Sequence, residues 1–159
     1  GFMLGSRSEH GGIIKDGAKM VNAMANSVVP KFTVIIGNSY GAGNYAMCGK
    51  AYDPRLIVGW PTAQLAVMGG EQAAKVLLQI EKASLKTKGE EIDEKAEKLL
   101  LKTITDRYDA QISPYYAASR LWTDAIIDPL ETRKVISMGI EAANNAPIKE
   151  AYNPGIIQS

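Results

Sequence analysis

An apolar run that ends in a glycine-rich turn is the feature that most restricts how this chain can fold. Residues 32–36 (FTVII) are apolar or β-branched with no polar alternation, which is typical of a strand buried on both faces. The turn that follows carries Gly37, Gly41 and Gly43, and a helix is predicted over about 43–50. A buried strand joined to a helix through a short turn favours a layered α/β domain.

The rest of the sequence continues this alternation of strands and helices. Short apolar runs predict strands at 56–58, 65–67 and 125–127. Helical spacing of apolar residues, together with turn residues, predicts helices at 13–26, 70–82, 90–111 and 130–144. We therefore expect a single domain in which helices cover a sheet.

Composition excludes several classes of function. Lys and Arg number 18 against 17 for Asp and Glu, so the chain lacks the strong positive charge of a dedicated nucleic-acid binder. Its single cysteine, Cys48, excludes an internal disulfide framework and a Cys-rich zinc site. No apolar run approaches the roughly 20 residues of a membrane-spanning helix. The first five residues (GFMLG) look like the end of a strand from a longer chain, so we expect an excised domain.

Two literal motif matches fall on the glycine turn, and both lack a required partner. Residues 37–41 (GNSYG) match the G-x-S-x-G pattern of serine hydrolases, which needs a histidine after Ser39 to accept its proton. The only histidine is His10, which precedes the serine. Residues 41–46 (GAGNYA) match the dinucleotide pattern G-x-G-x-x-A, but no acidic residue for the ribose follows about 20 residues later.

A third interpretation of the turn relies on the backbone alone. A strand, a turn of small residues and a helix N-terminus together present unpaired N–H groups at the positive end of a helix dipole. Such a turn is suited to an oxyanion hole, where charge develops on a carbonyl oxygen. A tightly packed turn without a ligand explains the pattern equally well, and the residues alone leave both possibilities open.

Four segments carry the most distinctive motifs of the chain: residues 9–20 (EHGGIIKDGAKM), 32–49 (FTVIIGNSYGAGNYAMCG), 60–74 (WPTAQLAVMGGEQAA) and 124–133 (DAIIDPLETR). In the same order, they resemble the C-terminal carboxyltransferase domain of the β subunits of biotin-dependent acyl-CoA carboxylases. The resemblance spans nearly the whole chain and implies a carboxylase of the methylcrotonyl-CoA or propionyl-CoA type. It is closest to the methylcrotonyl-CoA type, and propionyl-CoA-type enzymes are more distant at Asn44 and Tyr45.

The resemblance implies a fold and a site. The fold would be a single α/β domain, a crotonase-like ββα superhelix, covering residues 1–159 as one part of a longer two-domain subunit. The backbone N–H groups of Ala42 and Gly43 would form the oxyanion hole for the ureido oxygen of carboxybiotin. Gly41, Asn44 and Tyr45 would contribute to binding biotin or substrate, although Tyr45 could equally be a core aromatic. No metal is expected at this site.

The same resemblance implies cofactors and partners. Biotin, carried on a separate domain, would pass its carboxyl group to the α or γ carbon of a coenzyme A thioester, with a biotin nitrogen taking the proton. The expected partners are the N-terminal carboxyltransferase domain, the biotin carboxylase and biotin carrier subunit, and further copies of the subunit, in a hexamer. Alone, the domain is expected to be inactive. Nucleic acid and membrane are not expected partners, and the expected location is the bacterial cytoplasm or the mitochondrial matrix.

Two related activities remain open at the level of sequence. A crotonase-type enoyl-CoA hydratase or isomerase uses the same fold with one oxyanion hole, although it normally needs acidic side chains in its pocket. The carboxyltransferase of a biotin-dependent decarboxylase runs the same half-reaction in reverse.

Overall fold

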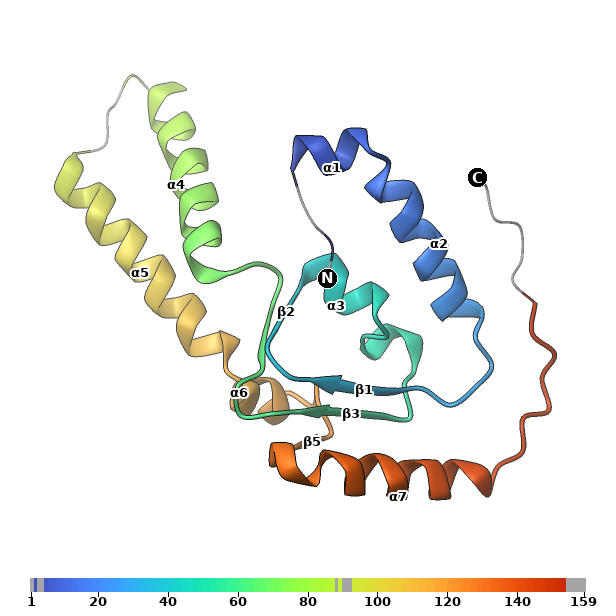
Figure 1. The fold of residues 1–159 in the computed structure, drawn as a ribbon. Helices are drawn as coiled ribbons and strands as arrows, with labels where there is room; N and C mark the ends of the chain where they lie inside the picture. Colours follow the sequence, from blue (N-terminus) through green and yellow to red (C-terminus); the bar gives the residue numbers. More distant parts are fainter. Residues whose placement is uncertain (1, 3–4, 88, 90–92, 154–159) are drawn as a thin grey trace.

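Two small parallel sheets form the centre of the protein. A computed structural model describes residues 2, 5–87, 89 and 93–153. The first sheet has the strand order β1-β3-β5, with strands Phe32–Ile35, Leu56–Gly59 and Ala125–Ile126 (Figure 1). The second sheet pairs β2 (Asn38–Tyr40) with β4 (Gln64–Ala66). All three strand pairings are parallel.

The chain passes from one sheet to the other in repeated strand–strand–helix units. β1 continues through two residues into β2 and then into α3 (Gly41–Ala46). β3 continues into β4 and then into α4 (Gly70–Thr87) in the same way. Because both strand pairs are parallel, the two units lie side by side as successive turns of a superhelix. This arrangement agrees with the crotonase-like fold that the resemblance implies.

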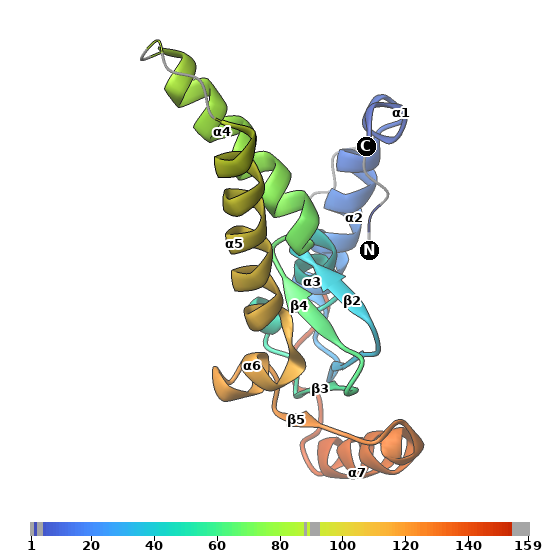
Figure 2. The same ribbon diagram turned by 90° about the vertical axis from the view of Figure 1, so that its left-hand side faces the viewer.

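Helices cover the sheets and extend beyond them. α2 (Ile13–Asn26) and α3 lie on one side of the β1-β3-β5 sheet and α7 (Thr132–Asn144) on the other (Figures 1 and 2). α4 and α5 (Glu94–Ile112) form a hairpin that points away from this sheet. None of the described helices is long and apolar enough to cross a membrane. The other described helices are α1 (Ser6–His10) and α6 (Pro114–Ser119), with short 3₁₀ turns at Lys50–Tyr52 and Pro129–Glu131.

The core lies between the two sheets and α6. Burial of apolar side chains stabilises this centre by roughly 25 cal/mol per Å² removed from water. α7 packs closely on the other face of the first sheet, since a Cβ at Gly139 would lie 2.8 Å from the ring of Phe32. The buried core cluster consists of Ile35, Ile57, Ala63, Leu65 and Ala117.

Asp124 joins the last strand to the rest of the first sheet. Its carboxylate accepts a hydrogen bond from the Ile57 N–H at 2.7 Å, and its own N–H donates to the Ile57 oxygen at 2.8 Å. Lys50 contacts the same carboxylate at 3.3 Å. β5 is only two residues long, so these bonds hold it beside β3.

The sequence predicted most elements and missed three. The strand at 32–36 is confirmed, as are the helices at 13–26, 70–82 and 130–144, with ends displaced by up to five residues. The helix predicted at 43–50 is wrong in its bounds, because α3 occupies Gly41–Ala46. The strand β2 and the helices α1 and α6 were not predicted.

Some predictions fall on residues that the structure does not describe. The start of the helix predicted at 90–111 lies partly outside the described residues, as does the strand end predicted at 1–5. In the described part of this helix, Lys98 pairs with Glu94 at 2.6 Å, one turn apart.

A buried threonine and a half-buried threonine allow a test of hydrogen bonding in this fold. Thr123 is 2% exposed, and its hydroxyl has no partner in the described part of the chain. Thr33 donates its hydroxyl to the Cys48 oxygen at 2.9 Å. Thr123→Val should leave the free energy of unfolding unchanged or raise it, whereas Thr33→Val should lower it by about 1 kcal/mol. Denaturant unfolding of the intact parent protein measures both, and equal losses would contradict the assignment.

Candidate functional site

The glycine turn forms the junction between β2 and α3. Gly41, the first residue of α3, has a φ of +51°, in the left-handed region that side chains disfavour. A Cβ at this position would lie 2.8 Å from the main-chain oxygen of Val67, which belongs to the connection between β4 and α4. Residue 41 must therefore be glycine both for its backbone angle and for this contact.

Ala42 and Gly43 are the second and third residues of α3. N–H groups in the first turn of a helix have no acceptor within the helix, and the side chain of Tyr40, which precedes α3, does not cap them. Both residues line a cavity of about 380 Å³, together with Gly41. Two such donors beside a cavity can bind an oxygen that gains negative charge.

The opposite wall of this cavity comes from the next strand-to-helix junction. This wall consists of Val67, Met68 and Gly69, which precede α4, and of Gln72 in the first turn of α4. The sequence analysis missed these residues. The signal that could have found them is the repeat of a short strand, a small-residue turn and a helix start at 65–70 (LAVMGG), the same order as at 38–43. The cavity thus lies between two equivalent turns of the superhelix.

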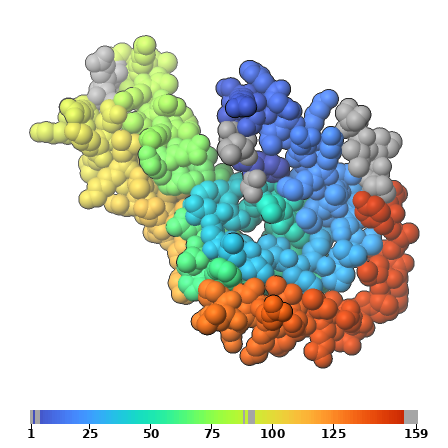
Figure 3. All heavy atoms as spheres, in the orientation of Figure 1, coloured from blue at the N-terminus to red at the C-terminus, as the bar shows by residue number. Residues whose placement is uncertain are grey.

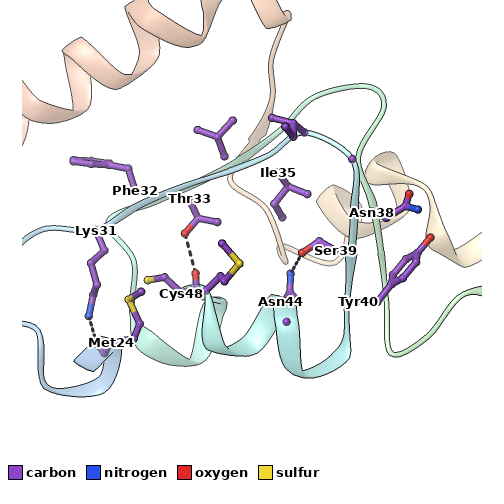
Figure 4. Close-up of a pocket in the computed structure, with 15 residues that line it drawn as sticks. Met24, Lys31, Phe32, Thr33, Ile35, Asn38, Ser39, Tyr40, Asn44 and Cys48 are labelled. Carbon is purple, nitrogen blue, oxygen red and sulfur yellow. Dashed lines mark hydrogen bonds between the residues drawn. The ribbon is translucent and has the colours of Figure 1, made fainter. Parts of the chain in front are cut away.

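Asn44 and Tyr45 follow Ala42 and Gly43 along α3. The Asn44 amide donates to the Ser39 hydroxyl oxygen at 2.9 Å, which ties the first turn of α3 to β2 (Figure 4). The Tyr45 ring is 48% exposed, and its centroid lies 4.8 Å from that of Tyr52. Among the described residues that line the cavity, neither Asn44 nor Tyr45 is included. Gly41, Ala42 and Gly43 are therefore brought together there, while Asn44 supports them.

The hydrolase motif has a structural explanation. The Ser39 oxygen accepts the bond from Asn44, so the serine helps to hold α3 in place. His10, the only histidine of the chain, is exposed on α1, at the far side of α3 from the strands (Figure 1). The sequence argument against a triad, which rests on the lack of a histidine after Ser39, stays a prediction.

Two titratable groups near the cavity, Tyr40 and Glu71, have shifted pKa values. Desolvation, and then the charge of Asp109, raises the pKa of Tyr40, whose hydroxyl donates to Gln64 at 2.6 Å. A hydrogen bond from Lys75, followed by its charge, lowers the pKa of Glu71. Across the described ranges, no cluster of three or more His, Cys, Asp or Glu could hold a metal ion. The cavity therefore offers main-chain donors and neutral polar groups.

Comparison with known proteins identifies the family. A family model described as a carboxyl transferase domain matches residues 1–155. The mitochondrial methylcrotonoyl-CoA carboxylase beta chain of Arabidopsis thaliana is 50% identical over 150 residues, which are 94% of this chain and 26% of that protein. The biotin-dependent 3-methylcrotonyl-coenzyme A carboxylase beta1 subunit of Mycobacterium tuberculosis is 48% identical, over 94% of this chain and 28% of that protein. The chain spans about a quarter of the length of these relatives.

Solved structures agree on the fold. The beta subunit of P. aeruginosa geranyl-CoA carboxylase matches with a TM-score of 0.80 and 39% identity, over 96% of this chain and 29% of that one. Transcarboxylase 12S, a hexamer solved with hydrolysed methylmalonyl-coenzyme A bound, matches with a TM-score of 0.79 and 33% identity. The match covers 100% of this chain and 29% of that one. The crotonase-like fold is thus confirmed, and the chain belongs to the carboxyl transferase domain family.

Proposed function

We propose that this chain is the biotin-facing domain of a carboxyltransferase in a biotin-dependent acyl-CoA carboxylase. In the intact enzyme it helps to transfer a carboxyl group from carboxybiotin to the α or γ carbon of an acyl-CoA. The observation that carries the proposal is the pair of uncapped N–H groups at Ala42 and Gly43, beside a cavity of about 380 Å³, in a member of the carboxyl transferase family.

The residues of the turn fit the ureido group of biotin. Carboxybiotin, when bound, would supply the carboxyl group and a ureido oxygen that gains negative charge. The N–H groups of Ala42 and Gly43 would donate hydrogen bonds to that oxygen and stabilise its charge most strongly when the charge is largest. Gly41 lets the turn bend toward Val67, and Asn44 keeps the two donors aligned through Ser39. No side-chain nucleophile is needed for this role.

The remaining parts of the reaction are assigned to partners. The N-terminal carboxyltransferase domain binds most of the acyl-CoA and stabilises its enolate, and a biotin carboxylase with its carrier domain supplies carboxybiotin. The full subunit assembles with further copies, as the hexamer of transcarboxylase 12S does. The substrate is a branched acyl-CoA of the methylcrotonyl type, since relatives with that name share about half of the sequence of this chain. We also assign to Tyr45 a part in shaping the acyl pocket.

The location follows the source of the parent protein. The Arabidopsis thaliana relative carries the word mitochondrial in its name. We assign the mitochondrial matrix if the parent protein is eukaryotic and the cytoplasm if it is bacterial.

The first functional test adds bulk at the donors. In the full-length subunit, Gly43→Val should crowd the approach of the ureido oxygen and lower kcat for transfer from carboxybiotin to methylcrotonyl-CoA by about 10²–10³-fold. Assembly and CoA binding should persist, because residue 43 is not held at a positive φ.

The matched control for this test is Ala42→Gly. This variant keeps both N–H groups, adds no atoms to the cavity and should retain turnover within about threefold, or roughly 0.7 kcal/mol. Thermal melting and the assembly state show whether each variant is folded. A folded Gly43→Val enzyme with normal turnover would show that residues 41–43 are only a packed turn.

A second test concerns the serine of the G-x-S-x-G match. Ser39→Ala removes the acceptor of Asn44 but no group that reacts in the proposed function. The variant should therefore reduce kcat less than tenfold, about 1.4 kcal/mol or less. A fluorophosphonate probe should leave Ser39 unlabelled, because no base activates it. Stoichiometric labelling of Ser39, detected by mass spectrometry of the wild-type enzyme, would instead support a hydrolase.

A further inference from the structure

Another cavity lies at the base of the α4–α5 hairpin, where α5 meets β4. Its volume is about 360 Å³, and it shares the lining residue Val67 with the cavity of the glycine turn. In Figure 3, the outer part of the hairpin (green and yellow) stands apart from the blue atoms of α1, so α1 does not cover it. A cavity of this size can hold a small molecule or a large part of one.

One face of α5 forms part of the lining. Ile104, Arg107, Tyr108 and Gln111 all line the cavity, and residues at this spacing of three and four lie on the same side of a helix. Ile104 is apolar, whereas the other three side chains carry polar groups. α5 thus places three polar side chains along a single cavity.

The rest of the lining is apolar. Val67, Leu77 and Trp122 are 74%, 41% and 47% exposed, which leaves apolar surface that a ligand can cover. The Trp122 ring lies edge-on to Tyr116, with the ring centroids 5.8 Å apart, so its position is supported from α6. The apolar lining residues outside α5 are Leu65, Ala66, Val67, Leu77 and Trp122.

The polar groups of this lining have no partners in the described part of the chain. Arg107 forms no ion pair there, and the Trp122 indole, the Tyr108 hydroxyl and the Gln111 amide form no hydrogen bonds there. Asp109 follows Arg107 by two residues but lies against the start of α4, with its Oδ1 3.0 Å from the Cβ position of Gly70. Arginine and indole groups only donate hydrogen bonds, and the described lining includes no carboxylate. The cavity therefore suits a phosphate or carboxylate that is attached to an apolar arm.

We propose that this cavity binds an anionic part of an acyl-CoA, with Arg107 as the charged contact. The proposal rests on the proposed function, because it takes the acyl-CoA of that reaction as the ligand. Val67 lines both cavities, so a ligand here lies next to the carboxybiotin site at Ala42 and Gly43. The contact adds to those of the N-terminal domain, which binds most of the acyl-CoA.

Two parts of this substrate class have the required chemistry. One is the phosphates of coenzyme A, and the other is the carboxylate that the thioester carries after the transfer. Both are oxyanions that an arginine can bind through two parallel N–H groups. Leu77 and Trp122 would cover the apolar part of the same molecule.

Ligand binding to the full-length, assembled subunit tests the contact and separates the two sources. Arg107→Gln removes the charge, and the fold should persist because Arg107 is exposed and unpaired within the described chain. Calorimetry gives the Kd of coenzyme A and of the carboxylated thioester formed from methylcrotonyl-CoA. If Arg107 binds a phosphate, both Kd values should rise about tenfold or more. If it binds the new carboxylate, only the Kd of the carboxylated thioester should rise by that factor.

The matched control is Arg120→Gln. Arg120 is also exposed, but its guanidinium lies 5.1 Å from the centre of the Tyr116 ring and does not line the cavity. Its replacement should leave both Kd values within about twofold, because solvent and salt screen a charge that does not contact the ligand. Unchanged Kd values for Arg107→Gln, or an equal loss for Arg120→Gln, would overturn the proposal. These measurements need no turnover, so the proposal can fail while the oxyanion role of Gly43 holds.

Discussion

The contact between Gly41 and the main-chain oxygen of Val67 determines the geometry of the candidate site. It brings the β2–α3 junction against the β4–α4 junction, so that two turns of the superhelix share one cavity. Any side chain at residue 41 would separate the junctions and also strain the backbone at its φ of +51°. The position of Ala42 and Gly43, and the approach of Met68 and Gln72 from the opposite wall, both depend on this contact.

The site is built from main-chain dipoles rather than from ionised side chains. Backbone donors need no proton transfer to be active, and their direction is fixed by the helix that carries them. Desolvation raises the pKa of Tyr40, so its hydroxyl remains a neutral donor to Gln64 across the physiological range. In the proposed function, a site of this kind polarises a cofactor that carries its own reactive atoms.

Sequence reasoning reached the α/β class, β1 and most of the helices, while the donor role of Ala42 and Gly43 stays a prediction. It failed where tertiary contacts determine local structure. β2 lies within the glycine turn as a strand only because β4 pairs with it, and at Gly41, where α3 begins, the close approach of the Val67 main chain leaves no room for a side chain. Met68 and Gln72 were not placed, because only the repeat at 65–70 indicates which loop faces the glycine turn. Helices with clear apolar spacing, such as α2 and α7, needed no such information.

The bonds between Asp124 and Ile57 also affect the order in which the protein folds. They join residues 67 positions apart in the sequence, and closing such a long loop costs conformational entropy before any contact compensates for it. The α4–α5 hairpin occupies much of that interval and consists of contacts between neighbouring helices, with Lys82 and Glu97 paired at 2.8 Å. When the hairpin forms first, it brings β3 and β5 together. A helical arm outside the sheets would thereby shorten the loop that must close before β5 pairs with β3.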